Sequence, residues 1–101
     1  MLYNKIIKIL DVSQENNVDI SVAKDILIAE NPLSIEDIMD TYKILDLYYK
    51  PITAFIREDR LDLIKEVCIL VENNDTQGIK NFMITHEDFI EQSFKKAQSN
   101  N

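Results

Sequence analysis

The densest run of apolar positions lies between Ser34 and Pro51, in the stretch SIEDIMDTYKILDLYYKP. Apolar side chains recur there at the three- and four-residue spacing of one helical face. They are Ile35, Ile38, Met39, Tyr42, Leu45 and Tyr49. Ser34 can begin a helix by accepting a hydrogen bond from the N–H of Asp37. Lys50 and Pro51 mark its end, because proline lacks the N–H that would continue a helix. The pattern predicts a helix that starts after Ser34 and stops before Pro51.

The second half of this predicted helix is apolar on more than one side, since Ile44, Leu47 and Tyr48 add apolar groups on the side away from the face that contains Tyr49. A helix that is apolar nearly all round is usually buried on several sides, which favours a central core helix. The alternative is a protein-binding patch formed by Leu47, Tyr48 and Tyr49, because exposed aromatic clusters often mark interfaces.

Two charged residues interrupt apolar faces. Asp46 falls on the face of Met39, and a buried carboxylate requires a partner. The candidates are Lys50, one turn later, and Arg60 in the next segment; alternatively, the helix end frays and Asp46 reaches water. We predict an Asp46–Arg60 contact, because the two residues interrupt the apolar faces of helices joined at Pro51.

The flanking segments have the same helical periodicity, with asparagine, aspartate and serine at the breaks. The predicted elements are a helix over 2–15 (or, from its β-branched residues, a short strand), a helix from Asp19 or Ser21 to Asn31, one long helix over 52–73, a short helix over 76–84, and a last helix capped within 85–88. The sequence therefore predicts an all-α fold, a small irregular bundle of about five to six helices. We expect a single domain over residues 1–101, with 98–101 a frayed tail.

Composition supports this fold class and narrows the function. One glycine and two prolines in 101 residues are too few for a turn-rich β-sandwich or barrel. The net charge of −7, from 11 basic and 18 acidic residues, disfavours direct nucleic-acid binding and attraction to an anionic membrane. Charged residues interrupt the N-terminal apolar stretch before a signal-type core forms, so we expect a cytoplasmic protein. The isoleucine-, asparagine- and lysine-rich composition resembles coding by an AT-rich genome, such as that of a low-GC bacterium, a phage or another virus.

Residues that could carry chemistry are few. Cys68 is the single cysteine and lies in the apolar run VCILV, where burial raises a thiol's pKa and lowers its reactivity. His86 is the single histidine, and we interpret it as a helix-start residue near solvent. One histidine and one distant cysteine cannot supply the three or four ligands of a zinc site. The sequence predicts no cofactor, no metal site and no enzymatic activity.

These observations favour a non-enzymatic helical protein-binding module: a small regulator, inhibitor or accessory subunit acting on a larger protein machine. The partner would be another protein, with Leu47, Tyr48 and Tyr49 as the contact patch. Two alternatives remain open. The acidic rows on the predicted helices could mimic nucleic acid and block the basic groove of a nucleic-acid enzyme, or the protein could be structural and self-associate as a homodimer.

Overall fold

The computed structural model describes residues 1–99, and within them the chain forms α-helices and one short 3₁₀ helix but no strand. The all-α prediction is confirmed, and the strand alternative at the N-terminus is wrong. The elements are α1 (Leu2–Asn16), α2 (Ile20–Glu30), η1 (Pro32–Ser34), α3 (Ile35–Leu47), α4 (Tyr49–Arg57), α5 (Leu61–Glu72) and α6 (Thr76–Ser99). Of the predicted frayed tail, residues 98 and 99 belong to α6, and residues 100 and 101 lie outside the described residues.

The helices form two compact units, with the division between Tyr48 and Tyr49. The first unit contains α1, α2 and α3, and the second contains α4, α5 and α6. Each unit has its own core. The expectation of a single domain stays a prediction.

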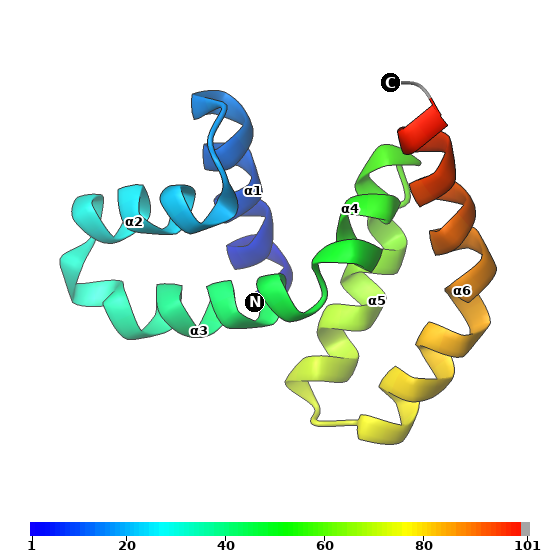
Figure 1. The fold of residues 1–101 in the computed structure, drawn as a ribbon. Helices are drawn as coiled ribbons and strands as arrows, with labels where there is room; N and C mark the ends of the chain where they lie inside the picture. Colours follow the sequence, from blue (N-terminus) through cyan, green and yellow to red (C-terminus); the bar gives the residue numbers. More distant parts are fainter. Residues whose placement is uncertain (100–101) are drawn as a thin grey trace. The chain divides into compact units, whose positions relative to one another are not determined.

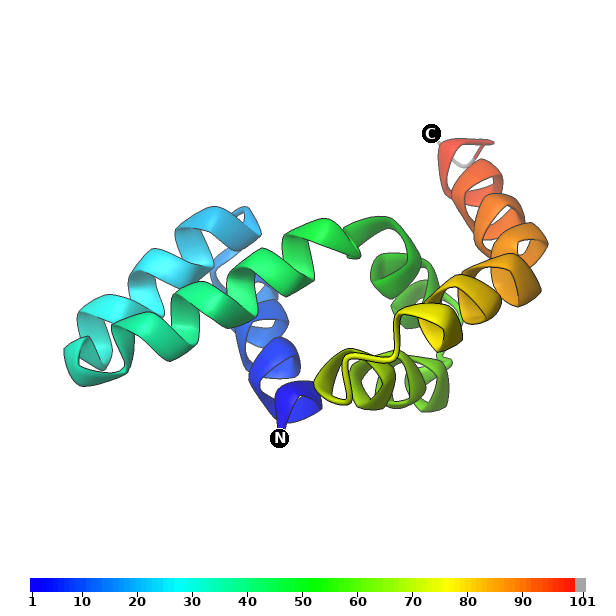
Figure 2. The ribbon, with the colours of Figure 1, turned by 90° about the horizontal axis from the view of Figure 1, so that it is seen from below.

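In the first unit, α2 and α3 run side by side in opposite directions, joined by η1, and α1 packs against both (Figures 1 and 2). Pro32 opens η1, where its fixed φ suits a tight turn and its missing N–H has no intrahelical acceptor to lose. The apolar faces of the three helices meet in one core. Its buried apolar side chains are Leu2, Ile6, Ile9, Ala23, Leu27 and Leu45.

In the second unit, the long helix α6 packs against both α4 and α5 (Figure 1). Phe55 of α4 is fully buried, and its ring lies 5.9 Å from that of Phe82 and 6.2 Å from that of Phe89, both on α6. Aromatic pairs at this separation stabilise a core beyond the area they bury. The other buried apolar residues of this unit are Ile52, Ala54, Leu63, Ile64, Val67, Cys68 and Ile90.

Three helices end in the same way, on a non-glycine residue with left-handed backbone geometry. Asn17 follows α1 with a φ of 52°, Asp59 follows α4 with 55°, and Asn74 follows α5 with 53°. After α4, the N–H of Arg60 donates to the carbonyl of Phe55 at 2.7 Å, the long-range bond of a Schellman motif. Glycine is the usual residue at this position, and asparagine and aspartate tolerate the geometry better than other side chains. In a chain with one glycine, Asn and Asp take this position after α1, α4 and α5.

The helix predicted over Ser34–Pro51 is shorter than expected. Ser34 makes no side-chain capping hydrogen bond, because it ends η1 with a φ of −100° and a ψ of 14° instead of the extended backbone of an N-cap. Pro51 does not stop the helix either. It is the third residue of α4, where a backbone N–H has no intrahelical partner and its loss costs nothing. Lys50 consequently lies in the first turn of α4, not in the last turn of α3.

Two other predicted boundaries are wrong. The long helix over 52–73 is two helices, α4 and α5, separated at Asp59 by the left-handed cap. The two helices expected on either side of Thr85 are the single helix α6, in which Thr85 donates its hydroxyl to the Asn81 carbonyl. The cap of α6 is Asp75, whose carboxylate accepts the N–H of Gly78 at 2.9 Å. A side chain at Gly78 would collide with that carboxylate, which explains a glycine inside this helix.

Candidate functional site

The three residues of the predicted protein-binding patch lie at the junction of α3 and α4. Leu47 is the last residue of α3 and is 73% exposed, and Tyr49 is the first residue of α4 and is 46% exposed. Tyr48, the C-cap residue of α3, is half-buried. Because the division between the units falls after Tyr48, Leu47 and Tyr48 belong to the first unit and Tyr49 belongs to the second. The surplus of apolar groups on α3 is thus partly exposed at its C-terminal end.

The predicted partners of Asp46 bind other carboxylates. Arg60 donates from Nε and Nη2 to Asp62, at 3.1 and 3.0 Å, and this hydrogen bonding lowers the pKa of Asp62. Lys50 binds Glu91 at 2.6 Å, and that hydrogen bond lowers the pKa of Glu91. Asp46 is exposed in its own unit, as the alternative interpretation expected. Because Asp46 and Arg60 belong to different units, the predicted Asp46–Arg60 contact stays a prediction.

A groove lies between the start of α4 and the middle of α6, with a volume of about 270 Å³. We call it the α4–α6 groove, and it is lined by Pro51, Met83, Ile84, Glu87, Ile90 and Glu91. Ile90 is buried, Met83 is half-buried, and Ile84 is 71% exposed. The Lys50–Glu91 ion pair lies at one edge of the groove, whereas Glu87 forms no ion pair within the described part of the chain. The sequence pattern did not indicate this surface.

A second groove, of about 350 Å³, lies among the helices of the first unit. We call it the α1–α2–α3 groove, and its lining residues are Met1, Asn4, Lys5, Lys8, Ile9, Leu27, Asn31, Ser34, Asp37, Ile38 and Thr41. Ile9 and Leu27 are buried and form part of its apolar surface. Lys5 binds Asp37 at 2.8 Å and so links α1 to α3.

Cys68 and His86 are both in the second unit. Cys68 is 2% exposed, and burial together with the charge of Glu72 raises its pKa to about 11, as the sequence predicted. His86 lies in the middle of α6, half-buried, with its ring 4.5 Å from that of Phe82 and 6.1 Å from that of Phe55. The prediction of a helix-start residue near solvent is wrong, because α6 does not break before it. His86 packs in the aromatic cluster around Phe55.

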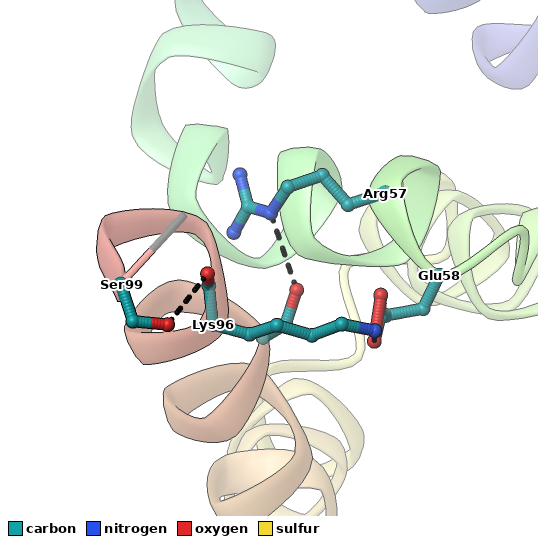
Figure 3. Close-up of polar contacts among 5 residues, drawn as sticks. Arg57, Glu58, Lys96 and Ser99 are labelled. Carbon is teal, nitrogen blue, oxygen red and sulfur yellow. Dashed lines mark hydrogen bonds and ion pairs between the residues drawn. The ribbon is translucent and has the colours of Figure 1, made fainter. Parts of the chain in front are cut away.

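The C-terminal ends of α4 and α6 share a cluster of polar contacts (Figure 3). Arg57 Nε donates to the hydroxyl of the buried Ser93 at 3.2 Å, and Lys96 lies 3.4 Å from Glu58. A serine nucleophile requires an adjacent base, and a guanidinium stays protonated at every working pH. The Arg57–Ser93 bond therefore connects α4 to α6 and satisfies the buried hydroxyl, and it does not activate Ser93 for catalysis.

Within residues 1–99, no three His, Cys, Asp or Glu side chains are grouped to hold a metal ion. None of the described helices combines the length and the apolar character needed to cross a membrane. No protein-family model, curated protein or solved structure matches the chain. The candidate sites therefore depend on the geometry and chemistry described above.

Proposed function

We propose that this chain is a non-enzymatic helical protein-binding module: a small regulator, inhibitor or accessory subunit that acts on a larger protein machine in the cytoplasm. The observation that carries the proposal is the exposure of Leu47 and Tyr49, at 73% and 46%, on either side of the half-buried Tyr48. Complete burial of an exposed leucine side chain contributes about 1.5–3 kcal/mol. Leu47 can therefore supply a substantial part of a specific interaction.

The chemistry of the patch also favours a protein partner. Tyrosine is enriched among the residues that dominate binding energy at interfaces, because its ring buries a large area at a small cost in conformational entropy. Two side chains that could act as nucleophiles, Cys68 and Ser93, have other structural roles. Cys68 is buried with a raised pKa, and the hydroxyl of Ser93 is bound by Arg57.

The test is an affinity measurement with the partner captured from the lysate of the native host. Leu47→Ser and Tyr49→Ser should each weaken binding about tenfold or more, a loss of about 1.4 kcal/mol or more. Leu33→Ser is the matched control, since Leu33 is fully exposed and lies outside the patch. All three variants should keep the wild-type helical signal in far-UV circular dichroism. If the patch variants bind as tightly as the Leu33 variant, the patch assignment is wrong.

The net charge of −7 favours a second candidate, an acidic mimic of nucleic acid that occupies a basic groove. Exposed charge pairs weaken as salt screens them, so binding by a mimic should fall steeply with ionic strength. Binding through Leu47 and Tyr49 should change little. Self-association, the third candidate, predicts a concentration-dependent mass in light scattering, and a constant monomer mass would exclude it.

A further inference from the structure

We propose that the α4–α6 groove binds a basic amphipathic segment of the partner protein, in which an apolar side chain is flanked by lysine or arginine. This inference rests on the proposed function, because it specifies the class of partner segment that the module takes. The groove lies on the second unit alone, and it begins two residues after Tyr49.

The apolar part of the groove is open to a partner. Met83, Ile84 and Ile90 fall on one side of α6 at near-helical spacing, and Pro51 of α4 completes the lining. Ile84 is 71% exposed, so this side of the helix is only partly covered within the unit. The volume of about 270 Å³ lies below the range of typical cofactor and drug sites, about 300–1,000 Å³. One or two side chains of a protein segment are a better match than a cofactor.

The charge around the groove selects the partner. Glu87 and Glu91 are its two charged lining residues, and Glu91 already binds Lys50 while Glu87 forms no ion pair within residues 1–99. The groove therefore offers an uncompensated carboxylate beside an exposed isoleucine. The chain's charge of −7 would speed the approach of a basic segment and oppose that of an acidic one. The α1–α2–α3 groove lacks this combination, because its Asp37 is already paired with Lys5.

The experiment measures binding of two labelled helical peptides to the full chain by fluorescence anisotropy. One peptide consists of leucine and lysine in an amphipathic arrangement, and the other has glutamate in place of lysine. Wild-type protein should bind the Leu/Lys peptide at least about tenfold more tightly than the Leu/Glu peptide. Failure to bind the Leu/Lys peptide, or equal binding of the two, overturns the proposal.

The variants separate the groove from simple charge attraction. Ile84→Asp adds a negative charge, which by electrostatics alone would strengthen binding of the Leu/Lys peptide. Because the substitution also removes an apolar contact, we expect it to weaken peptide binding about tenfold instead. Leu33→Asp adds the same charge at an exposed leucine of the first unit and should not weaken it. Likewise, Glu87→Lys should weaken binding more than Glu36→Lys, which changes an exposed residue of α3. Equal effects within either pair contradict the assignment.

Failure of this inference can be told apart from failure of the proposed function. If Leu47→Ser weakens binding of the captured partner while Ile84→Asp leaves both peptide and partner binding unchanged, the module remains and the groove is wrong. If Ile84→Asp weakens peptide binding but neither Leu47→Ser nor Tyr49→Ser changes the affinity for the captured partner, the groove assignment remains and the patch assignment is wrong.

Discussion

The left-handed cap at Asp59 determines whether Asp59→Ala stabilises or destabilises the protein. The sign of this change distinguishes the observed break between α4 and α5 from one uninterrupted helix. Asp59 has a φ of 55° and separates α4 from α5, where the apolar periodicity alone favours one uninterrupted helix. Replacing Asp59 by alanine has opposite consequences in the two cases. In an uninterrupted helix alanine is the better residue, whereas in the left-handed region aspartate is the better one, because its short polar side chain can hydrogen-bond locally.

The expected magnitudes follow from these two effects. In an uninterrupted helix, Asp59→Ala would stabilise the protein by up to about 0.7 kcal/mol, the difference in helix propensity. With the observed cap, Asp59→Ala should destabilise it by about 1 kcal/mol, because alanine lacks the local hydrogen bonding that helps aspartate in this conformation. Asp59→Gly should stabilise it by about 0.5 kcal/mol, since relief of the backbone strain exceeds the added flexibility of the unfolded chain.

Urea denaturation followed by far-UV circular dichroism measures these differences. Asp88→Ala is the matched control, because Asp88 is exposed inside α6 and the same substitution there should be neutral or slightly stabilising. If Asp59→Ala and Asp88→Ala both stabilise the protein, the left-handed cap gives aspartate no advantage over alanine and the prediction is wrong.

Two further predictions concern the core of the second unit. Burial raises the pKa of Cys68 from 9.0 to about 11, so the unfolded state loses this proton first and stability should fall as the pH rises from 9.0 to about 11. At about 1.36 kcal/mol per pKa unit the loss is at most about 2.7 kcal/mol, since solvent screening reduces it, and urea titrations over this pH range should show it in the wild type but not in Cys68→Ala. Phe55→Ala should cost about 3–5 kcal/mol in the same assay, because it empties the centre of the aromatic cluster. Ile56→Ala, which truncates its exposed neighbour, should cost far less, and equal losses would place the core elsewhere.

The fold class was predictable because helical periodicity recurs in every segment of the chain and glycine is scarce throughout. The bounds of α1 and α2 followed from asparagine and proline beside clear apolar stripes. Pro51 misled the prediction for a physical reason: a residue without an N–H fits equally well after a helix and in the first turn of the next one. The break at Asp59 was missed because the apolar stripe stays in phase across it, although aspartate between two polar neighbours was the available signal.

The candidate sites were less predictable, because they depend on how helices pack. The patch hypothesis stays a prediction, because the apolar periodicity around Leu47 also allowed a buried core helix. The ion pairs of Lys50 and Arg60 required the partners Glu91 and Asp62, of which only the second is near in sequence. The α4–α6 groove brings Pro51 beside Ile84, and no local pattern specifies that approach.

The division into two units of three consecutive helices has a kinetic consequence. In each unit the packed helices are neighbours or next neighbours along the chain, so loop closure costs little entropy before native contacts form. Chains dominated by such local contacts fold on about the microsecond-to-millisecond timescale, much faster than a ribosome adds residues. The first unit can therefore bury its apolar surface while the second is still being synthesised. That order shortens the time for which its unfolded apolar segments are available for aggregation.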